Sequence, residues 1–177
     1  QGLMACGFDG TSQDYDQIQK AKEWLLNLNS NVKAYALPAD VRDSMIRNEA
    51  ALAYMYSGNI VQAMGENDKI RLALNNEKVS LSMDTFVILK GTKHKTEAEL
   101  FLNFLLRPEI SAKLIEQFPY VCFNKAAADY LPEELANSPL VVLTDDLKNR
   151  IYMYNTFDGD GITYGIEAMT EVKTARG

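Results

Sequence analysis

Histidine and cysteine are scarce in this chain of 177 residues, which has one histidine, His94, and two cysteines, Cys6 and Cys122. A Ser/His/Asp triad or a metal site with two histidines could therefore be built only with unusual partners. His94 lies in the polar turn GTKHKTEAE, where a solvated surface role is expected. The cysteines lie far apart, outside any CxxC pattern, and we expect both to be small, buried apolar residues, with a disulfide as the less favoured alternative. These absences weigh against an enzyme.

Excess positive charge and long apolar runs are also missing. The chain has 18 Lys and Arg against 24 Asp and Glu, which gives a net charge of −6. Proteins that bind nucleic acids usually present a basic face that displaces counterions, so we expect no nucleic-acid partner. No apolar run approaches the roughly 20 residues needed to cross a bilayer. The glycines form neither of the two common phosphate-binding patterns, and we expect no cofactor.

One glycine-rich sequence, FDGDG at residues 157–161, invites comparison with a calcium-binding loop. Asp158 and Asp160 are two residues apart and Glu167 follows further on, as acidic ligands do in such loops. The match fails because Ile162 occupies the fifth ligand position and the closing glutamate is out of register. We therefore expect a flexible turn and no metal site.

Apolar residues at helical spacing alternate along the chain with short apolar runs of strand length. Helical patterns cover residues 14–28, 40–48, 59–68, 96–106, 108–118, 125–135, 145–154 and 162–172. Strand-like runs cover residues 32–37, 50–56, 69–74, 78–83 and 85–92. Strands that alternate with helices predict an α/β layer structure with a mainly parallel sheet flanked by helices.

Side chains that can start helices support this pattern. Ser12 or Asp14 can cap the first long helix, and Asp40 can cap the next. Pro108 occupies a first-turn position that favours a helix start.

Two residues stand out as candidate ligand contacts. Tyr56 ends an apolar run directly before a Ser-Gly-Asn turn, and ligands bind at the carboxyl ends of strands in open α/β sheets. The alternative for Tyr56 is packing in the core. Asp84 lies within the apolar sequence VSLSMDTFVIL, where a carboxylate is costly unless it is paired or close to solvent. Lys90 or Arg71 could pair with Asp84, or Asp84 could receive the ammonium group of a ligand.

Several sequence motifs occur together in the second half of the chain. A Met83-Asp84 pair leads into Leu89-Lys90-Gly91, a helical pattern ends Asn-Phe-Leu-Leu-Arg-Pro at residues 103–108, and a short segment ends at Asn124. With YSGN at residues 56–59 and the opening GFDGTSQDYDQI, these motifs resemble the spermidine/putrescine-binding proteins of bacterial ABC transporters. The resemblance is most specific over residues 83–135 and reaches about Tyr152.

This resemblance implies a two-lobed fold of the type II periplasmic-binding class. Residues 1–83 then form the first part of lobe two, residues 84–124 belong to lobe one, and residues 125–177 return to lobe two and end in a tail. Most of lobe one, with further acidic and aromatic ligand contacts, is expected to lie outside this sequence.

The resemblance also implies ligand contacts and a function. Asp84 matches an aspartate that binds a ligand amine, and Tyr56 matches an aromatic residue that packs on the methylene chain. Ser82 falls where relatives often carry a second aromatic wall, and Met153 falls near a position where some carry an amide. The implied function is to bind putrescine or spermidine on the extracytoplasmic side and to deliver it to an ABC transporter permease.

Two other classes of function stay open from the residues. One is an α/β hydrolase-type enzyme, for which the sequence offers no nucleophile motif. The other is a ligand-free interaction or sensor domain, because one fold can serve many functions.

Residues 84–124 are rich in large apolar side chains that would pack against the part of lobe one outside this sequence. Without that part, these side chains predict a contiguous exposed apolar patch. We expect either a homodimer, through exchange of elements between copies, or a rearranged docking of this segment on its own lobe. Since one wall of the cleft is incomplete, the chain alone is expected to bind polyamines weakly or not at all.

Overall fold

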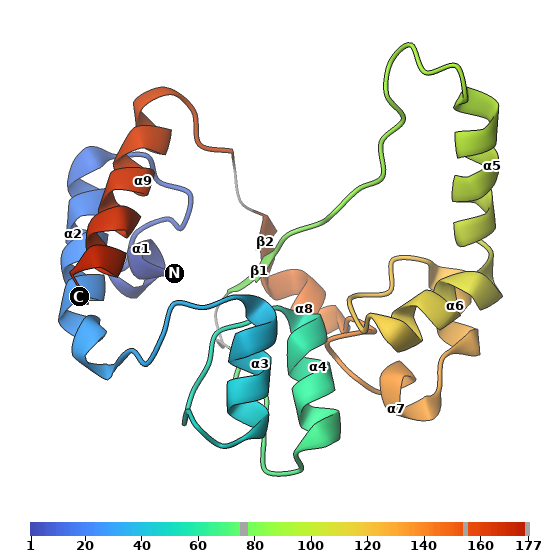
Figure 1. Ribbon diagram of the computed structural model, residues 1–177, viewed down its shortest axis with the longest axis horizontal. Helices are drawn as coiled ribbons and strands as arrows, with labels where there is room; N and C mark the ends of the chain where they lie inside the picture. The colour runs from blue at the N-terminus through green and yellow to red at the C-terminus, as the bar shows by residue number, and fades with distance from the viewer. Residues whose placement is uncertain (75–77, 154–155, 176–177) are drawn as a thin grey trace. The chain divides into compact units, whose positions relative to one another are not determined.

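The computed structural model describes residues 1–74, 78–153 and 156–175, and the chain divides into two compact units (Figure 1). Unit 1 comprises residues 1–35, 80–82 and 152–177, and unit 2 comprises residues 36–79 and 83–151. Each unit has buried apolar residues of its own. The assignment of residues to lobes, with boundaries at residues 83 and 124, stays a prediction.

Unit 1 is built from α1 (Gly2–Ala5), α2 (Tyr15–Leu28), the 3-10 helix η1 (Asn29–Asn31) and α9 (Gly159–Thr174). The start of α2 is fixed by Asp14, whose carboxylate accepts a hydrogen bond from the backbone amide of Gln17 at 2.9 Å. Such a bond satisfies one of the amides that the first turn of a helix leaves without a partner. Asp14, one of the two predicted caps, is therefore confirmed in that role.

The core of unit 1 lies where α2 packs along α9, two helices from opposite ends of the sequence (Figure 1). The buried side chains of these two helices are Ile18, Ala21, Ala168 and Val172. Two polar contacts add to the packing. Lys22 Nζ lies 2.8 Å from Glu171 Oε2, and Asn29 Nδ2 donates a hydrogen bond of 2.7 Å to the backbone carbonyl of Val172.

Gln13 holds the beginning of α9. Its Oε1 accepts a hydrogen bond of 2.9 Å from the backbone amide of Asp158. A Cβ atom at Gly161 would collide with the same side chain, so the close approach requires glycine at this position. The sequence 157–161, predicted as a turn, is therefore partly helical, because α9 begins at Gly159.

Unit 2 contains α3 (Pro38–Ile46), α4 (Ser57–Glu66), α5 (Lys95–Leu105), α6 (Pro108–Gln117), the 3-10 helix η2 (Lys125–Tyr130), α7 (Glu133–Ala136) and α8 (Asp145–Arg150). Both α3 and α6 begin with proline at the first helical position, where the missing amide leaves no bond unmade. The start of α6 at Pro108 confirms the prediction. The predicted cap at Asp40 was wrong, because Asp40 lies inside the first turn of α3 and Leu37 is the capping residue.

Two helix contacts organise unit 2. Helices α3 and α4 pack together, and Arg42 Nη1 donates to Gln62 Oε1 at 3.0 Å across their contact. Helix α6 packs on η2, where Ala112, Ile115 and Ala127 are buried.

Two short strands, β1 (Val79–Leu81) and β2 (Ile151–Met153), pair in a two-stranded sheet. The predicted helix over residues 145–154 was wrong for residues 151–153, because α8 ends at Arg150 and the β-branched Ile151 begins β2, while Tyr154 lies outside the described residues. The other runs predicted as strands, 32–37, 50–56, 69–74 and 85–92, form no sheet within the described residues. Residues 52–56 nevertheless keep the alternation of a strand, because exposed and half-buried side chains follow one another.

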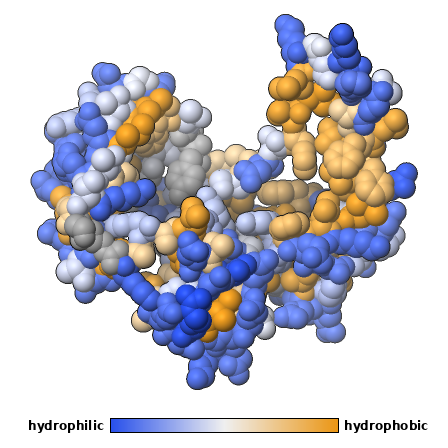
Figure 2. All heavy atoms as spheres, in the orientation of Figure 1, coloured by the Kyte–Doolittle hydropathy of each residue, from blue (hydrophilic) through white to orange (hydrophobic). Residues whose placement is uncertain are grey.

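Large apolar side chains are exposed on α5 and on the extended segment that precedes it. Phe86, Val87 and Leu89 are 75%, 77% and 76% exposed. Further exposed residues on and after α5 are Leu100, Phe101, Phe104 and Leu106. Figure 2 shows apolar residues gathered over α5. The predicted exposure of this region is confirmed for these residues, whereas the alternative of docking on the rest of the chain does not apply to them.

Candidate ligand-binding residues

Tyr56 lies directly before α4, at the end of the alternating segment. Tyr54 and Tyr56 are 73% and 57% exposed. Ala53, which precedes them, and Met55, which lies between them, are half-buried. Tyr56 precedes the first turn of α4 as its capping residue and contributes no side-chain hydrogen bond to the helix. Core packing therefore does not account for Tyr56, and its ring is accessible to a ligand.

Asp84 is an exposed carboxylate between Met83 and Thr85 in unit 2. Within the described part of the chain it takes part in no hydrogen bond or ion pair. Neither of the two cations considered as partners, Arg71 and Lys90, pairs with the Asp84 carboxylate. The Arg71 guanidinium donates to the backbone carbonyls of Asp68 and Ile70, and Lys90 forms no ion pair with Asp84. A structural ion pair therefore does not explain this carboxylate.

Ser82 and Met153 belong to unit 1. Ser82 directly follows β1 and is exposed, and Met153 is the last residue of β2 and is 56% exposed. Because β1 and β2 are neighbours in the sheet, these two residues lie on adjacent strands or directly beyond them. The structure thus places two predicted contacts in each unit.

Tyr120 is a residue near Tyr56 that the sequence patterns did not single out. Its ring lies against Gly58, in the first turn of α4, so closely that a Cβ at Gly58 would stand 2.9 Å from Cζ of the ring. The amide oxygen of Asn59, in the same turn, is buried and has no hydrogen-bond partner within the described residues. The one signal in the sequence was the glycine of YSGN, which indicates close approach but does not name the partner.

The two cysteines are free thiols, each half-buried rather than fully buried as predicted. Burial raises the pKa of the Cys122 thiol, against a smaller opposite effect from its hydrogen bond with the backbone of Asn124. A thiol of this kind is a poor nucleophile at neutral pH, because the thiolate is the reactive form. In the residues that the structure covers, no group of three His, Cys, Asp or Glu side chains could hold a metal ion. No helix among them is long and apolar enough to span a membrane.

Comparison with known proteins decides the family. Residues 1–142, well over half of the chain, match the family described as bacterial extracellular solute-binding protein. The chain belongs to this family. Membership in a family of solute-binding proteins favours the predicted binding function over the hydrolase alternative.

Curated relatives of this chain have names that state polyamine binding. It is 27% identical over 98% of its length to the spermidine/putrescine-binding periplasmic protein 1 of Haemophilus influenzae, and 25% identical over 91% to the putrescine-binding periplasmic protein PotF of Escherichia coli. These alignments cover 48% and 45% of the relatives. The chain therefore spans about half the length of the curated relatives it matches.

Solved structures show the same likeness. The spermidine/putrescine substrate-binding protein PotD of Streptococcus pneumoniae superposes with a TM-score of 0.83 at 27% identity, over 99% of this chain and 54% of that one. A putative spermidine/putrescine ABC transporter protein from Listeria monocytogenes gives a TM-score of 0.87 at 26% identity, over 97% of this chain and 53% of that one. The predicted fold class, an α/β lobe of the periplasmic-binding type, is confirmed.

Proposed function

We propose that the protein containing this chain binds a polyamine, putrescine or spermidine, on the extracytoplasmic side and delivers it to the permease of an ABC transporter. The observation that carries the proposal is the Asp84 carboxylate, which is exposed, lies in a largely apolar stretch of sequence and has no ion-pair partner within the described residues. A polyamine consists of ammonium groups joined by methylene chains. A site for it therefore needs a carboxylate for the ammonium groups and an apolar surface for the methylene chains. The names of the relatives, which state binding of spermidine and putrescine in the periplasm, support the same ligand class and location.

Two side chains of unit 2 have complementary roles in this proposal. Asp84 accepts charge-assisted hydrogen bonds from a ligand ammonium group, which are stronger than bonds between neutral groups. The exposed ring of Tyr56 covers the methylene chain with its face and attracts the cation through the ring quadrupole. Either residue alone would bind many molecules, and the pair selects an alkyl chain that ends in a cation.

Ser82 and Met153 are proposed as further ligand contacts, as the resemblance implies. Ser82 offers a hydroxyl where an aromatic wall would cover the alkyl chain, and Met153 offers a flexible apolar surface. Less of the ligand is then enclosed by aromatic rings, so we expect affinity to depend more strongly on Asp84.

The exposed apolar side chains support the proposed assignment of residues 84–124 to lobe one. Phe86, Val87 and Leu89 would be sheltered by further polypeptide of the kind that relatives of twice this length possess. The chain alone then presents only part of the binding cleft, and its affinity for polyamines should be weak.

Calorimetric titration of the full-length protein tests the function. Putrescine and spermidine should bind without being consumed, and 1,4-butanediol, which has the length of putrescine but no charge, should not bind. Binding of the diol as tightly as the diamine would contradict the role of the carboxylate. Chemical conversion of the amine would instead support an enzyme. The absence of any amine binding would favour the third class of function, a ligand-free interaction or sensor domain.

A further inference from the structure

We infer that unit 2 contains a groove that receives residues 84–90 of a second copy of the chain, so that two copies exchange this segment reciprocally. The exchange concerns association between copies of this chain, and it shares one residue, Asp84, with the proposed polyamine contacts. Four observations support it: the shape of the groove, the backbone groups along it, the segment itself, and the charges of both.

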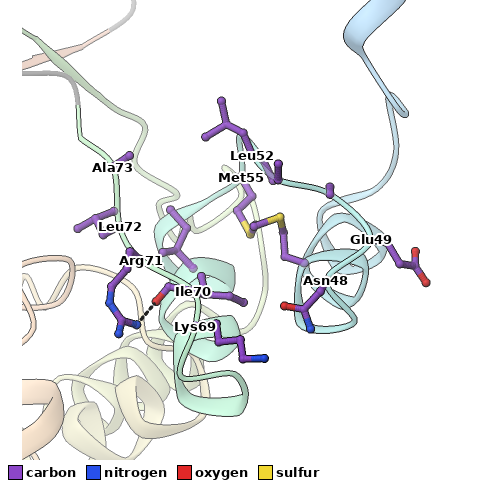
Figure 3. A pocket seen from close by; sticks show the side chains of 14 residues that line it. Asn48, Glu49, Leu52, Met55, Lys69, Ile70, Arg71, Leu72 and Ala73 are labelled. Atoms are coloured by element: carbon purple, nitrogen blue, oxygen red, sulfur yellow. Dashed lines mark hydrogen bonds between the residues drawn. The ribbon is translucent and has the colours of Figure 1, made fainter.

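The groove lies between α3, α4 and two segments outside helices and strands, residues 50–55 and 69–73 (Figure 3). Its volume is about 630 Å³, within the range of about 300–1,000 Å³ typical of ligand pockets. Apolar side chains form most of its lining, among them Met45, Met55, Ile60 and Ile70. Neither Tyr56 nor Asp84 lines it, so the groove is distinct from the proposed polyamine contacts.

The backbone along this groove is open to pairing. In the part of the chain that the structure describes, residues 50–53 and 71–73 donate and accept no backbone hydrogen bonds and belong to no helix or strand. Such a row of amides and carbonyls is a template for the addition of another strand. An extended peptide in the groove would gain main-chain hydrogen bonds as well as apolar contacts.

Residues 84–90, with the sequence DTFVILK, have matching properties. The segment is extended, and among the described residues no backbone hydrogen bond involves positions 84–88. Its apolar side chains Phe86, Val87 and Leu89 are about three-quarters exposed. Aromatic and β-branched residues of this kind favour strands.

The charges of the two surfaces are also complementary. Asp84 lies at one end of the segment, and Lys69 lies at the rim of the groove (Figure 3). Within the described residues neither side chain has an ion-pair partner in its own chain. Their pairing across two copies would join two exposed charges of opposite sign.

Reciprocal exchange would also let the contact close with two copies. A groove and a segment on different surfaces of one molecule make a heterologous contact, which extends into open fibres unless the geometry closes. When each copy gives its segment to the other, both grooves and both segments are used, and a dimer results.

Light scattering of the 177-residue chain across a dilution series tests the exchange. The wild type should show twice the monomer mass of 19.9 kDa at high concentration. Val87→Lys, in the segment, and Ala73→Trp, which fills the groove, should each lower the mass to that of the monomer. Both residues are exposed, so neither change should unfold the monomer, which circular dichroism verifies. Leu100→Lys on α5 is the matched control and should leave the dimer intact.

Mixing the two single variants gives the decisive result. The Val87→Lys chain keeps its groove and the Ala73→Trp chain keeps its segment, so the mixture should form a heterodimer through one restored contact. A mixture that stays monomeric, or a wild type that is monomeric at every concentration, would overturn the inference. Loss of the dimer in Leu100→Lys with retention in Val87→Lys would also overturn it, by placing the interface on α5. None of these outcomes bears on amine binding by the full-length protein.

Discussion

The ring of Tyr120 lies directly against the backbone of Gly58, where a Cβ atom would stand only 2.9 Å from the ring carbon Cζ. We predict that Gly58→Ala displaces this ring and destabilises unit 2 by about 1 kcal/mol, at the low end of the cost of overpacking because Tyr120 is partly exposed and can move. Urea denaturation measures the change.

Gly65, on the same helix α4, is the matched control for this substitution. A Cβ at Gly65 meets no atom within 4 Å, so Gly65→Ala should stabilise the helix by up to about 1 kcal/mol, the usual gain of alanine over glycine. Equal effects of the two substitutions would show that the contact with Tyr120 has no energetic consequence.

Val172 is fully buried in the contact between α2 and α9 and is one of the largest side chains with no exposure. Val172→Ala removes two buried carbon atoms and leaves a small cavity, so unit 1 should lose about 2 kcal/mol of stability. Ile166→Ala removes more carbon from an exposed site on α9 and should change stability by less than about 0.5 kcal/mol. Thermal unfolding of the two variants compares them, and the reverse order would contradict the described packing.

The Cys122 thiol should react slowly with iodoacetamide at neutral pH. Burial raises the pKa of this thiol above its ordinary value of about 9.0, so the pH at which its alkylation reaches half its maximal rate should lie above that value in the Cys6→Ser variant. The neutral thiol contributes fully to stability below the pKa that Cys122 has in the unfolded chain. This contribution is lost as the pH rises through the higher pKa that Cys122 has in the folded protein. A midpoint at or below 9.0 would contradict the effect of burial.

The features predicted correctly from the sequence are mostly local ones. Asp14 caps α2 through an amide three residues away, and Pro108 begins α6 because proline suits the first helical position. Each signal and its structural effect lie within a few residues, so the pattern alone contains the necessary information.

Features that depend on distant residues were predicted less well. Alternation and apolar composition identified residues 50–56 as extended, but a strand also needs a pairing partner, which the local sequence cannot specify. The contact of Tyr120 with Gly58 was missed for the same reason. Asp84 and Tyr56 could be named because an isolated carboxylate and an aromatic residue before a turn are visible in the sequence, whereas their roles still rest on a proposal.

The affinity of the full-length protein for spermidine, measured by calorimetry with Asp84→Asn, tests the central claim most directly. Asp129→Asn is the matched control, because Asp129 is another exposed carboxylate of unit 2 without an ion-pair partner among the described residues. Removing one partner of a desolvated charge pair costs about 2 kcal/mol or more, so Asp84→Asn should weaken binding by about thirtyfold or more, while Asp129→Asn should leave it unchanged. Unchanged affinity in Asp84→Asn would contradict the proposal that this carboxylate binds the ligand ammonium group.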